Sequence, residues 1–503
     1  MCKKGASICL KDLKCCCIIV WIYYAIVCDI ASKTNLEVTY MENAIILAGG
    51  LGKRMNSEKP KVLLEVLGKP MLSWVTDACV NAGIERICVV KGYGAEMIDD
   101  FVAGRFETAY QPERLGTGHA VMCAEDFLRA NPESHTFIAC GDAPFTDFKT
   151  IRAAYEYHKL SDSAVTVVTA EIAEPKGYGR IIRTKTGISG IVEEKDCTPQ
   201  QRAICEISSG CYWFKTSALL EALPKLTRNN AQGEYYLTDT IEILLKSGKK
   251  ATAFKTDNAD AVLGANDRKG LLKLNEIARQ RIIEKHLTAG VEFITTDGII
   301  ISPDVKIGRG TKVLPSTILM GKTEIGEDCV IGPNSRLTDV KVGDDSIMDN
   351  VVAVDSTVGN HVKVGPFVQL RPGTVMKDYS HAGDFVEIKN SVIGEGTSVS
   401  HLTYLGDSDI GKNVNFGCGT VTVNYDGTNK SRCTIGDNAF IGCNTNLVAP
   451  VKVGNAAYTA AGSTITKDVP DGALAIERGQ EVIKEGYAAK KLARHLEKGK
   501  KFN

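Results

Sequence analysis

The pattern of apolar and polar positions divides the chain into two halves of different texture. From residue 43 to about 265, short apolar runs alternate with amphipathic stretches such as residues 72–82. The short runs predict buried strands and the amphipathic stretches predict helices. Strands that alternate with helices predict a mainly parallel sheet with helices on both faces, whose ligands bind at the carboxyl ends of the strands. The predicted strands include residues 44–47, 86–90, 136–139 and 164–168.

A single helix is predicted between the two halves. Leu271, Leu274, Ala278 and Ile282 are spaced three, four and four residues apart, with charged residues between them. This period predicts a helix over residues 268–288, and we expect it to link two domains.

Beyond Gly290 the chain repeats a pair made of an aliphatic residue and a glycine. Successive pairs are six residues apart in several places, as between Ile325 and Ile331. A six-residue repeat predicts a parallel β-helix, in which the aliphatic side chain points into the stack and glycine permits the turn. Ordinary glycine-rich hairpins would not keep this phase. The pairs begin at residues 307, 325, 331, 342, 358, 364, 393, 410, 435, 441 and 453.

Three interruptions of the repeat, at residues 371–391, 394–410 and 419–435, are candidates for functional loops. Insertions in solenoids map to loops on one face, and such faces often carry a binding site. The basic tail, residues 481–503, is either a solvated end or an arm that meets a phosphorylated ligand.

The first 40 residues differ from the rest of the chain. Six of the 17 cysteines fall within the first 28 residues, and lysines precede the apolar run at 15–28. That run resembles part of a signal peptide and is short for a membrane span. Three interpretations stay open: a true start at Met41, which we favour, an export signal, and a short membrane anchor. We expect residues 1–40 to lie outside the fold. The rest of the chain is then a first domain (41–266), a linker helix (267–289), a second domain (290–480) and a tail (481–503).

Composition and charge narrow the classes of function. The 503 residues include 60 Lys and Arg against 60 Asp and Glu, so the formal net charge is zero. This balance lacks the basic footprint of a nucleic-acid-binding protein. The cysteines beyond residue 40 are scattered without CxxC spacing, which predicts reduced thiols in the cytoplasm.

A glycine-rich loop directly after the first strand is the first candidate for chemistry. It reads Leu47-Ala48-Gly49-Gly50-Leu51-Gly52-Lys53-Arg54, and Pro60-Lys61 follows. Glycines let backbone N–H groups approach an anion closely, and Arg54 and Lys61 can neutralise the phosphates of a nucleoside triphosphate. The loop is neither a Walker A loop nor a Gly-x-Gly-x-x-Gly motif.

These residues resemble the nucleotidyltransferase signature of sugar-1-phosphate pyrophosphorylases. Together with the hexapeptide half, the chain resembles the bacterial bifunctional N-acetylglucosamine-1-phosphate uridyltransferase / glucosamine-1-phosphate N-acetyltransferase family from about residue 42 to the basic tail. The resemblance implies an α/β Rossmann-like nucleotidyltransferase domain, residues 41–266, followed by a left-handed parallel β-helix acetyltransferase domain, residues 290–480. The supporting motifs are Gln111-Pro-Glu-Arg-Leu-Gly-Thr-Gly-His-Ala120, Gly141-Asp142, Gly177-Tyr-Gly-Arg180, Gly190-Ile-Val-Glu193 and Asn230-Ala-Gln-Gly-Glu-Tyr-Tyr236.

For the first domain the resemblance implies uridylyl transfer. A sugar-1-phosphate oxygen attacks the α-phosphate of UTP in line, which requires positioning and charge stabilisation and no general base. The resemblance implies Mg²⁺ at Asp142 and Asn266, and the family has Asn where this chain has Ser208. The nucleotide and sugar contacts would be Leu47, Ala48, Gly49, Gly50, Arg54, Lys61, Gln111, Gly116, Thr117, Gly179, Glu193, Ser208 and Asn266.

The second candidate site centres on His401. From the residues alone it is a packed loop histidine, a base, or a metal ligand with His361 and His381, although their spacing of twenty matches no local zinc motif. The resemblance implies that His401 is the general base for attack of the glucosamine-1-phosphate amine on acetyl-CoA. It implies amino-sugar phosphate contacts at Arg371, Lys389, Tyr404 and Asn415, and acetyl-CoA contacts at Cys418, Asn424, Tyr425, Cys443, Ala461 and Arg478. The family pattern has Ala at Cys418 and Ser at Cys443.

The resemblance as a whole implies a cytoplasmic homotrimer that makes UDP-N-acetylglucosamine for peptidoglycan and lipopolysaccharide precursors. Its partners would be the small molecules glucosamine-1-phosphate, acetyl-CoA and UTP, with no nucleic acid and no stable membrane association. One rival is a monofunctional pyrophosphorylase with a structural β-helix, which His401, Lys389 and Arg371 argue against. Another is a non-catalytic hexapeptide scaffold, which the intact glycine loop and Asp142 argue against.

Overall fold

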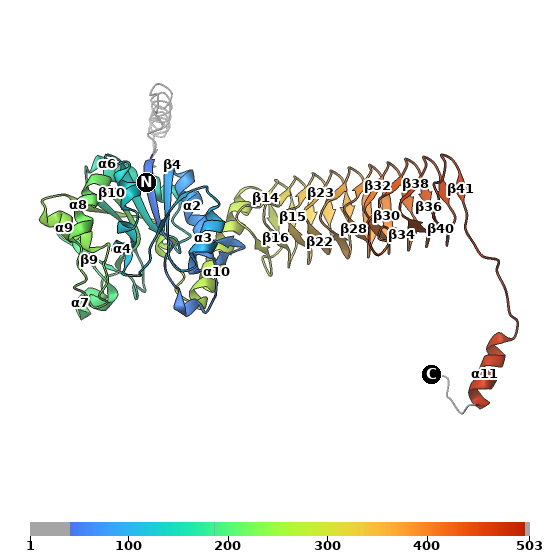
Figure 1. Ribbon diagram of the computed structural model, residues 1–503, viewed down its shortest axis with the longest axis horizontal. Coiled ribbons are helices and arrows are strands. Elements are labelled where there is room, and N and C mark those ends of the chain that lie inside the picture. The colour runs from blue at the N-terminus through green and yellow to red at the C-terminus, as the bar shows by residue number, and fades with distance from the viewer. Residues whose placement is uncertain (1–40, 186, 498–503) are drawn as a thin grey trace, which may run out of the picture. The chain divides into compact units, whose positions relative to one another are not determined.

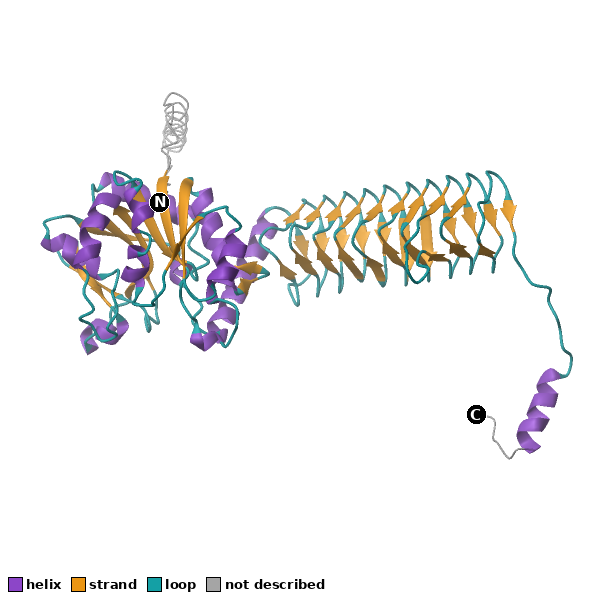
Figure 2. Cartoon of the chain, in the orientation of Figure 1, coloured by secondary structure: helices purple, strands orange, loops and turns teal. Residues whose placement is uncertain are grey.

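The structure is a computed structural model that describes residues 41–185 and 187–497 (Figure 1). The three interpretations of the N-terminal extension fall outside the described residues. The described residues divide into two compact units: the first comprises residues 41–65 together with 70–272, and the second comprises 66–69 and 273–497. Helices and strands are mixed in the first unit, whereas stacked strands and loops make up the body of the second (Figure 2).

Parallel strand pairing organises the first unit, as predicted. β1 (Met41–Leu47) pairs in parallel with β4 (Ile84–Lys91) on one side and with β6 (His135–Cys140) on the other. β10 (Glu206–Lys215) lies antiparallel between β6 and β7 (Val165–Glu171), which the alternating pattern did not predict. The order is β11-β7-β10-β6-β1-β4-β5, with β11 (Ala251–Lys255) and β5 (Glu107–Tyr110) at the edges and β8 (Arg180–Arg183) and β9 (Ile188–Val192) attached through β10.

Both faces of this sheet are buried under helices, also as predicted. Ile45 of β1 packs into one core, while Ala44 and Ile46 pack into the other, and all three are fully buried. A strand with two buried faces reads as a continuous apolar run, which is why β1 shows no alternation. The helices that cover the sheet are α2 (Met71–Asn81), α3 (Ala95–Val102), α4 (Thr117–Met122), α5 (Glu125–Arg129), α6 (Phe148–Leu160), α8 (Thr216–Ala222) and α9 (Asp239–Lys246), whereas α7 (Pro199–Arg202) has no buried residue.

The helix expected over residues 268–288 is confirmed as α10 (Arg268–Thr288). Leu271, Leu274, Ala278 and Ile282 are all buried, so the spacing correctly identified its apolar face.

The hexapeptide half forms a left-handed parallel β-helix of three sheets, as the resemblance implied. The sheets run from β12 (Glu292–Phe293) to β41 (Leu474–Ala475), from β13 (Ile300–Ile301) to β40 (Thr464–Ile465), and from β14 (Lys306–Ile307) to β38 (Val451–Val453). Buried aliphatic residues recur every six positions, as at 301, 307, 313, 319, 325, 331 and 337. Each coil therefore buries its apolar row against the coils next to it.

Two of the three predicted interruptions are not insertions. Parallel pairing joins Met376 to Ile393 and Ile393 to Ile410, so each coil there advances by 17 residues and the solenoid continues. Those stretches lack the aliphatic-Gly pair but keep buried aliphatic residues such as Ile388. The third interruption is real, since Ile410 pairs with Ile435 and the coil between them is longer by a loop over residues 424–432.

One corner of the β-helix carries exposed apolar side chains on successive coils. Phe367, Phe385 and Leu402 are each more than half exposed, and the rings of Phe367 and Phe385 stack with centroids 5.3 Å apart. All three have φ between 46° and 59°, a left-handed conformation that bulky residues rarely adopt. We call these three residues the apolar corner. Within the described part of the chain, no helix has both the length and the apolar composition needed to cross a membrane.

A buried histidine pair supports the first unit from within. The Nε2 atom of the fully buried His158 lies 3.0 Å from Nδ1 of His135, and its Nδ1 lies 2.8 Å from the Thr166 hydroxyl. Burial, and then the charges of His135 and Lys215, lower the pKa of His158 to about 3. The folded unit therefore holds a neutral ring at a pH where the unfolded chain binds a proton.

The first unit should lose stability as the pH falls below about 6.5, the pKa of an unperturbed histidine. His158 contributes full stability above that pH and costs up to about 1.4 kcal/mol for each unit of pH below it, until its folded pKa is reached. Urea unfolding followed through Trp74 and Trp213 fluorescence would measure this between pH 7 and 5. His158→Gln should flatten the slope; equal slopes in both proteins would contradict the assignment.

Candidate functional site

The glycine loop lies at the carboxyl end of β1, where the first unit gathers its polar side chains. Gln111 is buried against the loop, and a Cβ added to Gly49 would stand 2.8 Å from its Oε1. The Gln111 amide donates to the carbonyl of Gly116, 3.1 Å away. A Cβ on Gly92 would collide with the main chain of Gly49. Glycine is therefore required at Gly92, where any side chain would meet the main chain of Gly49, whereas a side chain at Gly49 would displace the amide of Gln111.

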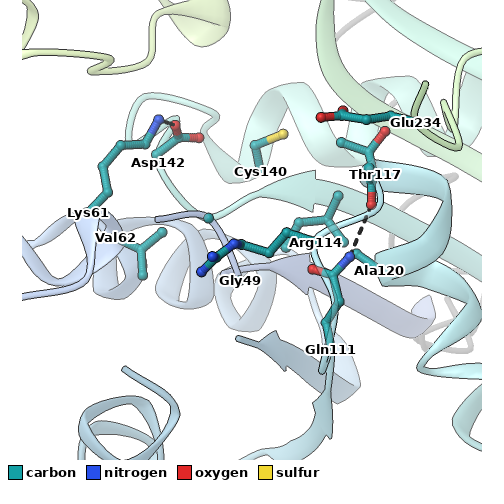
Figure 3. Close-up of a pocket in the computed structure, with 13 residues that line it drawn as sticks. Gly49, Lys61, Val62, Gln111, Arg114, Thr117, Ala120, Cys140, Asp142 and Glu234 are labelled. Carbon is teal, nitrogen blue, oxygen red and sulfur yellow. Dashed lines mark hydrogen bonds and ion pairs between the residues drawn. The ribbon is translucent and has the colours of Figure 1, made fainter. Parts of the chain in front are cut away.

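A first cavity of about 290 Å³ opens above this loop (Figure 3). Most of the predicted nucleotide contacts line it together, namely Leu47, Gly49, Gly50, Lys61, Gln111, Gly116 and Thr117, and so does the predicted metal ligand Asp142. Ala48 is buried behind the lining, and Arg54 is exposed on the short helix η1 (Lys53–Met55) and is not a lining residue. Arg114, Cys140 and Glu234 line the cavity without having been predicted.

Lys61 is the focus of charge in this site. Its ammonium forms an ion pair with the Asp142 carboxylate and donates to the Asn266 side-chain oxygen at 3.0 Å. The Lys61 and Asp142 side chains are only 14% and 21% exposed. Asp142 follows β6, and Asn266 lies just before α10. Two side-chain oxygens from distant parts of the chain thus converge on the Lys61 ammonium.

A second cavity of about 230 Å³ shares Leu47, Thr117, Cys140 and Asp142 with the first. The predicted sugar contacts Gly179, Glu193 and Ser208 line it, as do Asn266, Tyr178 and Tyr212. A Cβ on Gly179 would stand 2.7 Å from Ile191 and 3.5 Å from the Glu193 carboxylate, so a larger residue would fill the cavity.

Glu193 is the carboxylate of the second cavity. Burial raises its pKa, while the Thr238 hydroxyl, which donates to Oε1 at 3.3 Å, opposes the shift. A half-buried carboxylate beside a hydroxyl suits the recognition of sugar hydroxyl groups.

The Ser208 side chain is shorter than the Asn that the family has at this position, where a sugar contact is expected. Its hydroxyl lies 3.2 Å from the Tyr212 phenol and accepts from the Gly210 N–H at 3.2 Å. It is therefore partly engaged within the wall of the cavity.

The loop that holds Gly179 is tied down by a buried arginine. Arg180 is 1% exposed, and its guanidinium pairs with Glu194 at 2.7 Å. The same carboxylate accepts from the Gly177 N–H at 3.1 Å, and these two contacts lower the pKa of Glu194.

In the second unit, parallel register stacks the predicted phosphate-binding residues. β25 (Val368–Leu370), β28 (Glu387–Lys389) and β31 (Tyr404–Gly406) are neighbours in one sheet, with Glu387 paired to Tyr404 and Lys389 paired to Gly406. Arg371 follows β25 and reaches across to Glu387 at 2.8 Å. Arg371, Lys389 and Tyr404 are thus brought together by successive coils.

The loop at residues 424–432 adds a cation that the sequence reading missed. Lys430 pairs with Tyr425 across the base of this loop, and the nearby Lys430 ammonium lowers the pKa of Lys389. Asp407 lies beside them and accepts from the amides of Asn390 and Asn424. Burial would raise the Asp407 pKa, but these two amides and both lysines lower it. The 25-residue spacing from Ile410 to Ile435 was the signal that could have pointed to Lys430.

His401 heads a column of predicted site residues on the neighbouring sheet. Ser398 of β30 (Ser398–His401) pairs with Asn415 of β33 (Asn415–Phe416), and Asn415 pairs with Phe440 of β36 (Phe440–Ile441). This register places His401, Cys418, Cys443 and Ala461 at matching positions of successive coils, and Asn444 donates from its N–H to the Cys418 carbonyl at 2.7 Å. His401 and Cys443 are exposed, as is Arg478 beyond β41.

The alternatives for His401 fit the structure poorly. His401 is exposed rather than packed. His361 stacks on Tyr379 at a different corner, and His381 lies 3.5 Å from the Ser398 hydroxyl. Across the residues that the structure describes, no three His, Cys, Asp or Glu side chains are grouped so as to hold a metal.

Comparison with known proteins covers both units. A nucleotidyl transferase family model matches residues 43–262, and a bacterial transferase hexapeptide model of six repeats matches 304–339 and 432–467. The bifunctional protein GlmU of Caldanaerobacter subterraneus subsp. tengcongensis is 49% identical over 450 residues, 89% of this chain and 98% of that protein. GlmU proteins of a Geobacillus strain and of Clostridioides difficile are 47% and 46% identical, over 88% and 89% of this chain and 97% of each relative.

Proposed function

Because the chain belongs to the family of the bifunctional GlmU proteins, we propose that each of its two units carries one of two successive reactions. The protein is an enzyme that acetylates glucosamine-1-phosphate with acetyl-CoA and couples N-acetylglucosamine-1-phosphate to UMP from UTP. We assign the uridylyl transfer to residues 41–266 and the acetyl transfer to residues 290–480. The observation that carries the first assignment is the pair of adjoining cavities that share Asp142.

For uridylyl transfer, we place UTP in the first cavity and the sugar phosphate in the second. The glycine loop, Gln111, Gly116 and Thr117 bind the nucleotide, and Lys61 and Arg114 neutralise its phosphates. Glu193 and Gly179 hold the sugar so that its phosphate oxygen lies in line with the α-phosphorus. Attack forms the new P–O bond as pyrophosphate leaves, and the chain mainly orients the two anions.

Asp142 and Asn266 fit the Mg²⁺ that the family implies. Both oxygens already converge on the Lys61 ammonium, and hard oxygen ligands in small number are what Mg²⁺ takes from proteins that bind nucleotide phosphates. Bound there, Mg²⁺ would supply charge neutralisation for the phosphates.

For acetyl transfer, we propose that Arg371, Lys389 and Lys430 bind the phosphate of glucosamine-1-phosphate. Two neighbouring ammonium groups, whose proximity lowers the Lys389 pKa, are stabilised when a dianion lies between them. His401 takes a proton from the glucosamine-1-phosphate amine as the amine nitrogen attacks the thioester carbonyl carbon. The C–S bond then breaks, and the proton passes to the CoA sulfur.

The order of the two reactions follows from the sugar that each site accepts. The second cavity of the first unit receives the acetylated sugar phosphate, so acetylation comes first. We further propose a cytoplasmic enzyme, in keeping with the cysteines, all free among those described.

We propose that three chains assemble with the acetyl site between subunits. The apolar corner supports this because an exposed column of Phe367, Phe385 and Leu402 gains burial only from another surface. Asn415 and His401 lie on one sheet and Arg371, Lys389 and Tyr404 on the next, an arrangement that a neighbouring chain can complete.

His401→Ala should abolish acetyl transfer and spare uridylyl transfer. Loss of a general base costs about 10²–10⁴-fold in rate, and the two sites lie in separate units. Mass spectrometry of the products from glucosamine-1-phosphate, UTP, Mg²⁺ and acetyl-CoA measures both steps. His361→Ala is the matched control, because His361 stands at a different corner. If wild type consumes no acetyl-CoA yet uridylylates supplied N-acetylglucosamine-1-phosphate, the monofunctional rival is correct.

Ser208→Asn should lower the KM for N-acetylglucosamine-1-phosphate by a few-fold, because a longer amide reaches further into the second cavity than the serine hydroxyl. Steady-state kinetics would measure this, and the KM for UTP in the same variant is the internal control. Equal changes in both KM values would argue against a sugar contact at this position.

Phe385→Asp should dissociate the proposed trimer, since a charge at the apolar corner would be buried without a partner. Light scattering would report a smaller particle, and acetyl transfer should fall while uridylyl transfer persists. Leu160→Asp, at the exposed end of α6, is the matched control. A variant that keeps the wild-type mass would exclude this corner as the interface.

A further inference from the structure

The Lys61 ammonium stands where the oxygens of Asp142 and Asn266 converge. It forms an ion pair with the Asp142 carboxylate, and the Asn266 oxygen accepts from it at 3.0 Å. Both charged side chains are largely shielded from water, so little solvent screens them. Lys61 therefore contacts both of the oxygens that we propose as metal ligands.

A lysine and a divalent cation cannot share these two oxygens. An ammonium that donates to both oxygens repels a second cation strongly where screening is weak. Asn266 Oδ1 and Asp142 Oδ2 are both engaged by the Lys61 ammonium, so a divalent cation that takes these two oxygens displaces it.

The same lysine has a second anionic partner available when nucleotide is bound. Lys61 lines the first cavity, which we assign to UTP, whereas Asn266 lines the second. Its ammonium ends a flexible four-carbon chain and carries three donors, so it can turn from the carboxylate toward a phosphate. The phosphates would draw it away and at the same time offer oxygens to the metal.

We propose that Lys61 is an internal competitor of the divalent metal: it holds the Asp142–Asn266 position in the nucleotide-free enzyme and yields it when phosphates withdraw the ammonium. Metal therefore binds weakly before the nucleotide, and the two ligands promote each other's binding. This inference rests on the proposed metal role of Asp142 and Asn266.

The test is Mn²⁺ binding to the nucleotide-free, full-length protein, followed by the loss of the free Mn²⁺ signal in electron paramagnetic resonance. Lys61→Met should bind one Mn²⁺ per chain about tenfold more tightly than wild type, because the competing ammonium is gone. Lys61→Arg, which keeps the cation, should bind no more tightly than wild type. Lys59→Met removes the same charge from an exposed position two residues away and serves as the matched control.

Each outcome decides one part of the proposal. If Lys61→Met and Lys59→Met bind Mn²⁺ equally, the effect is general charge and the competition is overturned. Lys61→Met with Asp142→Asn should lose the new site; if Mn²⁺ still binds as tightly, the metal assignment itself is wrong. Urea unfolding followed through Trp74 and Trp213 fluorescence reports whether the first unit of each variant has folded.

Discussion

Parallel strand pairing in register decides where nearly every functional side chain of this protein stands. In the first unit it brings the carboxyl ends of β1, β4 and β6 to one edge, so that loops separated by many residues face a common space. In the second unit the same pairing repeats coil after coil and stacks matching positions into columns. Backbone pairing thus places side chains together at the strand ends in the first unit and at matching coil positions in the second.

Electrostatics gives the two sites a common character. Each gathers cations: Lys61, which pairs with Asp142, and Arg114 around the first cavity, and Lys389 beside Lys430 on the β-helix. The two neighbouring lysines of the β-helix repel each other in the free protein, and a phosphorylated ligand between them would relieve that cost. The neutral net charge of the chain hides this, because opposite charges are distributed over the rest of the surface.

The sequence predicted most of the fold because period and burial are tightly coupled. Six-residue spacing identified buried positions such as Ile325 and Ile331, and the three-four spacing identified the face of α10. The antiparallel strand β10 escaped prediction, since direction leaves no mark on an apolar run that is buried on both faces. Two expected loops proved to be ordinary coils, because aliphatic residues without a following glycine fill the stack equally well.

For the sites, motif resemblance found residues that period could not. It singled out Gln111, Glu193 and Asp142, which line the cavities, and it quoted Arg114 within a motif without giving it a role. Cys140 and Lys430 escaped it because they reach the sites through tertiary placement: Cys140 by ending β6, and Lys430 by the fold-back of its loop. The roles assigned to all of these site residues, Arg54 and Ala48 included, stay predictions.

The column that contains His401, Cys418, Cys443 and Ala461 also differs chemically from the family pattern, because it carries two thiols. A family pattern of Ala and Ser at the two middle positions offers a weak nucleophile at most, whereas two thiols, one of them exposed, offer strong ones. A reactive electrophile that reaches these two thiols would bond to this protein and leave relatives with Ala and Ser at these positions untouched. Because the register of the β-helix places both cysteines in one column, a single covalent inhibitor could distinguish this protein from its close relatives.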